Sequence, residues 1–449
     1  MQELIQETLW KKAARISKDK DDTGSRLWVP GLVFLKYMSH AFDRLFRRLE
    51  GDERNRLQRS ENADKYLAEN LLYIPQRSRW EYVLAQINRM GIGNVLDEAM
   101  EYIERFNPAV QQILPREYAS PHIRVDQLIM FMEMLEALPK EYFRTGEILR
   151  SVYSFFVRNY LAAGDKRQES LCTPEWVDKL LVAMVGPRKG KIFDPCCGVA
   201  SMLVESHAFI SQQQNSKNPT DRILFYGQES RLTNFKLCRM NLAIHGLDGT
   251  HVGWNNESSL DEDLHPGLKA DYILCAPPYN SRYPDWIQYI ISHLAPGGVA
   301  GMVLSKDSLS AGETSSMFTG NLYQGDARGN PAGNIGLDCI VALPDRLFHA
   351  AGMSACLWMM RKGKSRFAAA DDREPDNNIL LIDAPSNIPD VPHNQQHTLS
   401  STQINEIVAA YRRWQEQKGD YKDVKGFCKT VDWNTIKRNH FDLTPKRYV

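Results

Sequence analysis

The chain has 449 residues, of which 43% are hydrophobic and 24% are charged, and its formal net charge is +0. This length suggests two or three domains with a substantial apolar core, and the balanced charge excludes a global basic field but not local phosphate-binding patches. The start has no apolar signal core and no run of about 18 apolar residues occurs, so neither a secretory signal nor a membrane span is expected.

Residues 1–140 are predicted to form a helical domain. Apolar side chains recur at helical spacing in residues 32–49, with Pro30 near the start, and again in residues 124–138. The charged stretch at 42–59 is either a solvated helix face or a contact with a DNA backbone.

Residues 141–385 are predicted to form an α/β domain. Short apolar strands alternate with helices here, which implies a doubly wound, largely parallel sheet covered on both faces. The expected strands are residues 191–197, 222–229, 270–278, 297–305, 336–344, 356–363 and 378–384. Residues 386–449 are expected to be a helical tail, with a capped amphipathic helix at 401–417.

The eight cysteines are scattered, and none forms a Cys-x-x-Cys pair. A zinc site is therefore not expected. Cys196 and Cys197 are adjacent and cannot easily bridge each other. Scattered, unpaired cysteines are typical of a reducing compartment, which predicts a cytoplasmic protein.

The segment 191–206 is the first candidate site. Its strand ends at Asp194, turns through Gly198 and enters a helix at about Ser201, which is where an open α/β sheet binds a nucleotide-like ligand. Gly198 would let the backbone approach such a ligand. The loop is neither a GxGxxG motif nor a P-loop, so phosphate binding is poorly supported, and an ordinary strand–helix turn remains the alternative.

Two further strand ends carry candidate side chains. Glu229 lies just past the apolar core of the next strand, where a carboxylate can accept hydrogen bonds from two ribose hydroxyls; the alternative is a surface glutamate. The strand at 270–275 runs into Pro277, Pro278 and Tyr279, which offer a rigid backbone and a flat ring for stacking. A plain strand-terminating turn is the alternative there.

These motifs together resemble the amino-methyltransferases of DNA. They are Asp-Pro-Cys-Cys-Gly at 194–198, Gly-Gln-Glu at 227–229 ahead of a helix at 236–246, and x-Pro-Pro-Tyr at 276–279. Their order places the cofactor loop before the catalytic loop. Segments 9–16, 31–43, 286–305, 339–360 and 421–449 resemble the modification subunit of Type I restriction-modification systems, so the resemblance covers nearly the whole chain.

The resemblance implies a class I S-adenosylmethionine-dependent methyltransferase fold and methylation of adenine N6 in DNA. The implied cofactor-binding residues are Ser170, Leu171, Cys172, Thr173 and Pro174, then Asp194, Gly198, Val199, Ala200 and Ser201 at the methionine portion, Glu229 at the ribose and Glu257 near the adenine. The implied catalytic loop is Ala276, Pro277, Pro278 and Tyr279. The implied partners are a DNA-specificity subunit, double-stranded DNA, a restriction or motor subunit and a second modification subunit.

The amphipathic segments at 32–49 and 401–417 have more apolar surface than a lone domain requires. This predicts that they pack against a second chain, which the resemblance identifies as a specificity subunit with two-fold pseudo-symmetry.

The sequence departs from the family pattern in four places. Ala276 replaces the Asn or Asp that accepts a hydrogen bond from the adenine amine, and Cys172 replaces an aromatic residue. Val199-Ala200-Ser201 occupies a loop that usually contains glycine, and a short connection follows Tyr279. Since an engineered knock-out would change one residue, these departures favour natural loss or severe weakening of methyl transfer. A catalytically silent assembly subunit is the competing hypothesis, and methylation of an amine in RNA or protein is a third.

Overall fold

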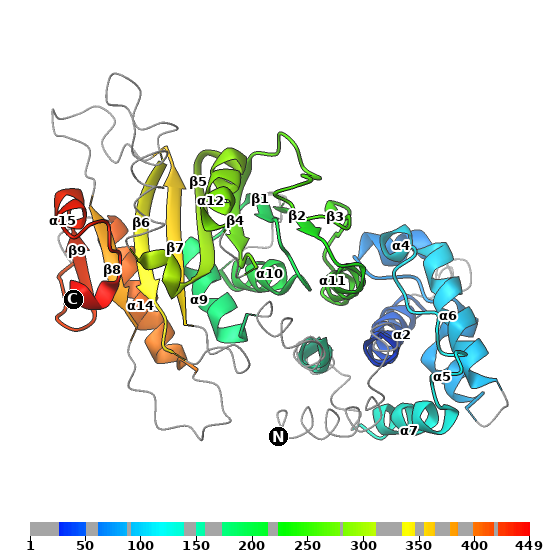
Figure 1. Ribbon diagram of the computed structural model, residues 1–449. Coiled ribbons are helices and arrows are strands. Elements are labelled where there is room, and N and C mark those ends of the chain that lie inside the picture. The colour runs from blue at the N-terminus through cyan, green and yellow to red at the C-terminus, as the bar shows by residue number, and fades with distance from the viewer. Residues whose placement is uncertain are drawn as a thin grey trace. The chain divides into compact units, whose positions relative to one another are not determined.

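The computed structural model describes residues 27–50, 62–87, 91–138, 150–157, 173–213, 223–278, 282–310, 335–345, 354–363, 378–384, 398–416 and 421–449 (Figure 1). The chain folds as two compact units. The first comprises Met1–Gly164, Gly198–Ala200 and Arg231–Asn256, and the second comprises Asp165–Cys197, Ser201–Ser230 and Glu257–Val449. The boundaries expected at residues 140 and 385 stay predictions.

Helices dominate the described part of the first unit. They are α2 (Trp28–Glu50), α4 (Ala63–Ala68), α5 (Trp80–Leu84), α6 (Ile92–Phe106), α7 (Val125–Glu136) and α11 (Leu232–Ile244), with the 3-10 turns η1 (Gln76–Ser78) and η2 (Pro108–Val110) and the short strand β3 (Val252–Trp254). The helices predicted at 32–49 and 124–138 are confirmed as α2 and α7. Pro30 lies in the first turn of α2, where its missing N–H costs no hydrogen bond.

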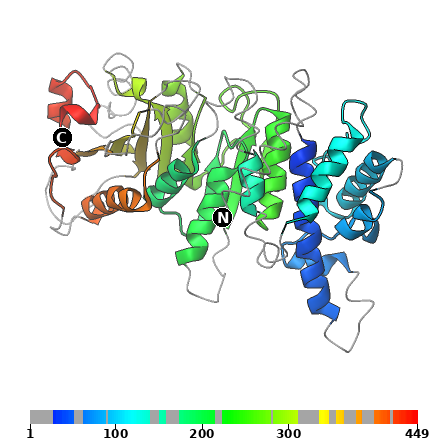
Figure 2. The same cartoon turned by 90° about the horizontal axis from the view of Figure 1, so that it is seen from below.

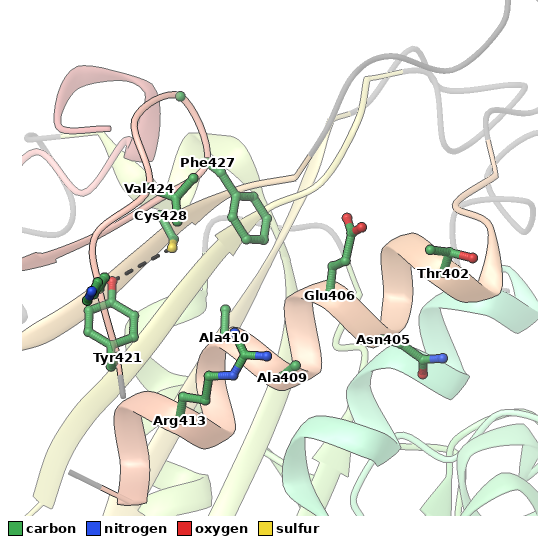
Figure 3. Close-up of a pocket in the computed structure, with 12 residues that line it drawn as sticks. Thr402, Asn405, Glu406, Ala409, Ala410, Arg413, Tyr421, Val424, Phe427 and Cys428 are labelled. Carbon is green, nitrogen blue, oxygen red and sulfur yellow. Dashed lines mark hydrogen bonds between the residues drawn. The ribbon is translucent and has the colours of Figure 1, made fainter. Parts of the chain in front are cut away.

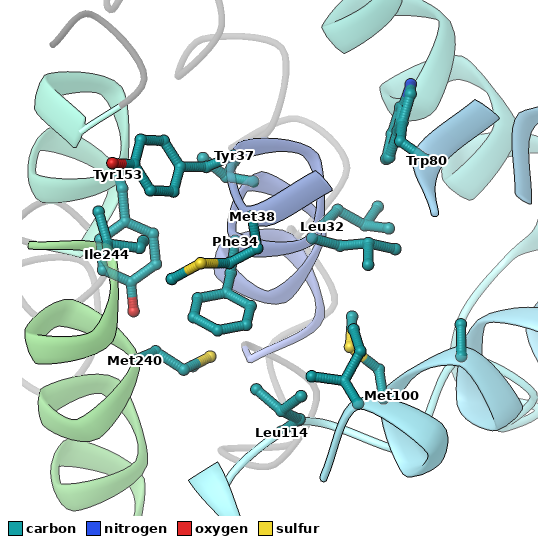
Figure 4. Packing of buried hydrophobic residues seen from close by; sticks show 14 of the residues in the cluster. Leu32, Phe34, Tyr37, Met38, Trp80, Met100, Leu114, Tyr153, Met240 and Ile244 are labelled. Carbon is teal, nitrogen blue, oxygen red and sulfur yellow. The ribbon is translucent and has the colours of Figure 1, made fainter. Parts of the chain in front are cut away.

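The apolar face of α2 is the centre of this unit's core. Phe34 and Met38 point toward Met240 and Ile244 of α11, and Leu32 points to the other side of the helix (Figure 4). All of these side chains are at most 1% exposed. The expectation that this face is surplus and available to a second chain is therefore wrong, because the chain's own α11 and neighbouring helices already bury it.

The second unit contains a mixed sheet in the order β2-β1-β4-β5-β7-β6-β8-β9. The strands are β1 (Gly190–Asp194), β2 (Ile223–Glu229), β4 (Ala270–Cys275), β5 (Leu294–Ser305), β6 (Ile335–Ala342), β7 (Ala355–Lys362), β8 (Ile379–Asp383) and β9 (Cys428–Val431). Every strand predicted from the sequence is present. β2, β1, β4 and β5 are mutually parallel, and the chain leaves β1 in one direction and β4 in the other, so a topological switch point lies between them.

Two strands depart from the expected, largely parallel sheet: β7 in its direction, and β9 because no strand was expected there. β7 is antiparallel to both β5 and β6, and β9 is antiparallel to β8. β9 also lies in the tail that was expected to be helical, where it extends the sheet by four residues. An apolar run looks the same in either direction, so the sequence pattern could not distinguish them.

Helices cover both faces of this sheet (Figure 2). They are α9 (Glu175–Val185), α10 (Ser201–Gln213), α12 (Tyr283–His293), α14 (Ser401–Glu416) and α15 (Trp433–Arg438), with 3-10 turns at η5 (Lys306–Leu309) and η7 (Pro445–Arg447). Alternation along β5 shows the two faces. Ala300 and Met302 pack in the cluster that contains α12, whereas Gly301 lies against Leu181 of α9.

The helix α14, predicted at 401–417, packs against the sheet and is held there by two side-chain hydrogen bonds. Its Tyr411 hydroxyl donates to the buried Asp338 of β6 at 3.3 Å, and Arg412 donates to the carbonyl of Ala183 in α9 at 2.9 Å. Its apolar side chains, including Ile407 and Trp414, are buried within the unit. The apolar face of α14 is therefore also buried by the chain's own residues and is not left over for a second chain. None of the described helices combines the length and apolar character needed to span a bilayer.

Candidate cofactor and catalytic site

Three neighbouring parallel strands bring the predicted site residues to one edge of the sheet. β1 ends at Asp194, β2 ends at Glu229, and β4 ends immediately before Ala276 and Pro277. Asp194 is paired in register with Gly227 of β2. We expect Asp194, Glu229 and Pro277 to lie at the carboxyl ends of three neighbouring parallel strands and to face one cleft. Their positions at the strand ends are confirmed, and the shared cleft stays a prediction.

The turn after β1 is held by local hydrogen bonds. The Asp194 carboxylate accepts from the backbone N–H of Cys196 at 3.1 Å, which is the Asx-turn geometry that aspartate favours. The N–H of Cys197 donates to the carbonyl of Gln228 at 3.0 Å, and the Ser259 hydroxyl donates to the carbonyl of Pro195 at 2.5 Å. The backbone at 194–197 is therefore fixed from two sides.

The next residues adopt backbone conformations that favour glycine. Gly198 has a φ of 54°, and a Cβ at this position would have no heavy atom within 4 Å. Open space therefore faces its Cα. Ala200 has a φ of 63°, which costs a residue with a side chain about 1 kcal/mol. The departure from glycine noted in the sequence thus falls on a position where the backbone prefers glycine.

Val199 and Ser201 complete this loop. Val199 is buried, and its carbonyl accepts a hydrogen bond from the Asn241 side chain at 2.8 Å. Ser201 is the first residue of α10. The role of both residues at the cofactor stays a prediction.

Gly198→Ala separates backbone strain from ligand contact. We expect it to destabilise the protein by about 1 kcal/mol, because an L-residue is strained at this φ, and to weaken cofactor binding because the methyl group occupies the open space. Gly426 is a matched control, since it has a φ of 76° and equally open surroundings far from the site in sequence. Urea unfolding and calorimetry measure the two effects. Equal cofactor affinity in both variants would contradict a ligand at Gly198.

Buried carboxylates gather at the strand ends. Asp178 of α9, Asp194 and Glu229 are at most 8% exposed. Burial, and after it the nearby negative charges of Asp178 and Glu229, raise the pKa of Asp194 to about 8. Thr173, at the start of α9, donates its hydroxyl to Asp178. A cationic ligand would favour the ionised form of such a buried carboxyl group and would be stabilised by its charge.

Asp178 was not predicted from the sequence. The signal in the sequence was a single acidic residue at a position where helical spacing places apolar side chains. The structure shows that this residue is fully buried. Thr173 is buried and Pro174 is the N-cap residue of α9. Their predicted contact with the cofactor stays a prediction.

Two buried thiols lie at the strand ends beside the catalytic loop. Cys196 and Cys275 share a side-chain hydrogen bond, and burial raises the pKa of both thiols. A thiol protonated at neutral pH reacts poorly, so thiolate chemistry is disfavoured here. Ala276 is half-buried and Pro277 is buried, so the loop offers backbone carbonyls and a methyl group.

Several predicted residues stay without a structural account. Ser170, Leu171, Cys172 and Tyr279 lie outside the described residues. Glu257 is exposed on the loop between β3 and β4, and its placement near the adenine stays a prediction.

A large groove lies elsewhere in the second unit. It has a volume of about 890 Å³ and runs between α14 and residues 421–428 (Figure 3). Ala409 and Ala410 lie along its α14 side, and Glu406 and Arg413 extend from the same helix into it. None of the predicted cofactor or catalytic residues lines it.

Comparison with models of known protein families identifies the family of this chain. The family model for N-6 DNA methylases matches residues 144–285 and 282–449, and a model for the HsdM N-terminal domain matches residues 5–132. The chain belongs to the N-6 DNA methylase family. The cofactor of this family is S-adenosylmethionine.

Curated relatives support this membership along most of the chain. A Type I restriction enzyme MjaIX methylase subunit from Methanocaldococcus jannaschii is 26% identical, over 98% of this chain and 83% of the relative. The HindI methylase subunit from Haemophilus influenzae is 28% identical, over 80% of this chain and 83% of the relative.

A solved structure shows the same fold. The type I restriction-modification methyltransferase subunit from Streptococcus thermophilus superposes with a TM-score of 0.73, covering 100% of this chain and 99% of that chain at 18% identity.

The residues at the strand ends fit S-adenosylmethionine in part. This cofactor supplies a positively charged sulfonium methyl donor, and its amino acid portion carries an ammonium group. Asp178, Asp194 and Glu229 provide carboxyl groups that, once ionised, supply the negative charge that such a ligand needs. Ala276, by contrast, supplies no side-chain acceptor to a substrate amine.

Proposed function

We propose that this chain is a modification-subunit-like protein of a Type I restriction-modification or related phage-defence system. Its site is built for S-adenosylmethionine-dependent methylation of adenine N6 in DNA, and we infer that transfer is weak or absent. The observation that carries this proposal is Ala276, placed at the end of β4 beside strand ends that carry buried carboxylates. A cytoplasmic location, which the scattered cysteines predict, is part of the proposal.

Each residue has a role in the proposed reaction. Glu229 would accept hydrogen bonds from the ribose hydroxyls, and Asp194, once ionised, would balance the positive charge of the cofactor. A target adenine leaves the duplex before it can enter the site. The carbonyl of Pro277 then accepts one hydrogen of the N6 amine, and Tyr279 stacks on the base.

The missing acceptor weakens this reaction at one step. The lone pair of an adenine N6 amine is delocalised into the ring, so the amine is a poor nucleophile. Two acceptors favour a pyramidal nitrogen aimed at the methyl group, and positioning supplies the rest of the acceleration. With Ala276, only one acceptor is present.

The alternative is a catalytically silent scaffold subunit that binds a specificity subunit, DNA or an active paralogue. Ala276 favours it as well, because base binding by Pro277 and Tyr279 survives the loss of the acceptor. Titration of S-adenosylmethionine into the purified protein by calorimetry separates the two. Binding supports a weakened enzyme, and absence of binding supports the scaffold.

The proposed partners are a DNA-specificity subunit, double-stranded DNA, a restriction or motor subunit and a second modification subunit. The relatives are methylase subunits of Type I restriction enzymes, and a solved structure with a TM-score of 0.63 concerns complex assembly of the type I R-M system. The groove beside α14 supports a docking role for this helix, although its apolar face is buried.

The partner proposal predicts a stable complex. Co-purification from the native operon followed by mass measurement is expected to give this chain together with a specificity subunit. Arg413→Glu, on the groove side of α14, is expected to weaken that complex, because it reverses an exposed charge without removing core packing. A strictly monomeric protein in the presence of every operon partner would count against the proposal.

A further inference from the structure

The loop at residues 257–268 contacts both sides of the candidate site. It connects β3 to β4 and packs over the carboxyl end of β2. Its anchor is Gln228, which is 1% exposed. The Gln228 side chain donates to the carbonyl of Glu262 at 2.7 Å and accepts from the N–H of Leu264 at 3.0 Å. One buried amide therefore pairs with two backbone groups of the loop, much as a neighbouring strand would.

The cofactor side of the loop is fixed by Ser259. This residue is 5% exposed, and its hydroxyl donates to the carbonyl of Pro195, directly after Asp194. The backbone carbonyl of Gln228 accepts from the N–H of Cys197 on the same turn. Gln228 thus holds the turn at 195–197 through its backbone and holds the loop that grips this turn through its side chain.

The other side of the loop is fixed to α12, the helix that follows the catalytic segment. Asp263 accepts from the Tyr289 hydroxyl at 2.9 Å and lies 3.0 Å from the Nε2 of His293. Asp261 accepts from Arg282, just before α12, at 3.0 Å and 3.2 Å. The ion pair of Arg282 with Asp261 is exposed and therefore contributes little stability. The hydrogen bonds made by Gln228, Ser259 and Asp263 are largely shielded from water and are therefore stronger.

We propose that Gln228 and Ser259 are positioning residues that hold the turn at 195–197 in its ligand-binding conformation through the loop 257–268. Neither side chain is assigned a contact with the cofactor or substrate. Their effect passes through the carbonyl of Pro195 and the backbone of residues 262–264. Loss of the Ser259 hydroxyl removes its hydrogen bond to the carbonyl of Pro195 directly. Loss of the Gln228 side chain frees the loop that carries Ser259, and so weakens the same restraint on the turn. The consequence for cofactor affinity rests on the proposed function, while the restraint on the turn does not.

The test compares three variants in the full-length chain. Gln228→Met keeps the side-chain volume and removes both hydrogen bonds, Ser259→Ala removes one, and Ser259→Thr keeps the hydroxyl. The matched control is Asn107→Ala in the first unit. Asn107 is also a buried amide that pairs with backbone, since it accepts from the N–H of Tyr73 and donates to the carbonyl of Tyr73, both at 2.8 Å.

Hydrogen exchange at the Cys196 and Cys197 amides is the first measurement, and it needs no ligand. We expect exchange to accelerate about tenfold in Gln228→Met and Ser259→Ala, with recovery in Ser259→Thr and no change in the control. Unchanged exchange in both variants overturns the proposal. If Gln228→Met does not fold, Ser259→Ala and Ser259→Thr decide the outcome alone.

Calorimetry with S-adenosylhomocysteine is the second measurement. We expect the dissociation constant to rise about tenfold in the variants that accelerate exchange, and not in Asn107→Ala. Faster exchange with an unchanged dissociation constant overturns the positioning role toward the cofactor. Faster exchange in a chain whose native form binds no ligand supports the restraint on the turn and contradicts the proposed function instead.

Discussion

Replacing Ala276 by asparagine is expected to raise methyl transfer to DNA adenine by about 100- to 1000-fold, the range typical of one preorganised polar group. The new amide accepts the second hydrogen of the adenine amine, beside the carbonyl of Pro277. Because this hydrogen bond strengthens as the nitrogen becomes pyramidal, the effect should fall on kcat rather than on substrate binding. Tritiated methyl transfer by the complex assembled with its specificity subunit is the measurement.

Ala276→Leu is the matched control, because leucine has the branched shape and the number of heavy side-chain atoms of asparagine but no acceptor. We expect it to stay as inactive as the native chain. Recovery in Ala276→Asn alone identifies position 276 as the lesion and shows that the other loop departures are tolerated. No recovery, together with absent cofactor binding, supports the scaffold alternative. Robust methylation by the native chain would falsify this account of the acceptor.

Cofactor affinity is expected to increase with pH up to about pH 8. Burial and the charges of Asp178 and Glu229 raise the pKa of Asp194 from its ordinary value of 3.8 to about 8, so the carboxyl is protonated at neutral pH without ligand. A cationic ligand favours the ionised form, so binding releases a proton. Below about pH 8 the affinity should then rise by up to about tenfold per pH unit. Calorimetry over a pH series, in buffers of different ionisation enthalpy, measures both affinity and proton release.

The same shift has the opposite sign for the ligand-free protein. The folded pKa lies above the unfolded one, so the folded state binds more protons between pH 3.8 and about pH 8. Stability is therefore greatest below this window and declines as the pH rises through it. Urea unfolding should therefore show a stability that falls with pH without ligand and a nearly pH-independent stability with saturating ligand, because the ligand-bound and unfolded states both carry ionised Asp194.

Two substitutions test the assignment to Asp194. Asp194→Asn should flatten the pH dependence and weaken cofactor binding by about 10- to 100-fold, because a charge-assisted contact is lost. Asp178→Asn removes one of the charges that raise the Asp194 pKa, so the midpoint should move to lower pH while the slope remains. A pH profile that persists in Asp194→Asn assigns the titration to another group.

Local patterns were sufficient for the strands and for the position of the candidate site. The apolar run of β1 stops at Asp194, that of β2 stops at Glu229, and that of β4 stops at Cys275 before two prolines. A strand end marked by a charged residue or by proline is a local feature, so the sequence alone located these residues. Their positions at neighbouring strand ends followed from the rule that parallel strands end at one edge.

The sequence by itself determined the family, the strands and the missing acceptor at Ala276, because these depend on residue identity and on short-range order. Tertiary structure decided what depends on long-range contact. It set the antiparallel direction of β7 and β9, placed the apolar face of α2 against α11, and brought Ser259 to Pro195 across 64 residues of sequence. It also raised the pKa of Asp194, because burial and neighbouring charge exist only once separate segments of the chain pack together.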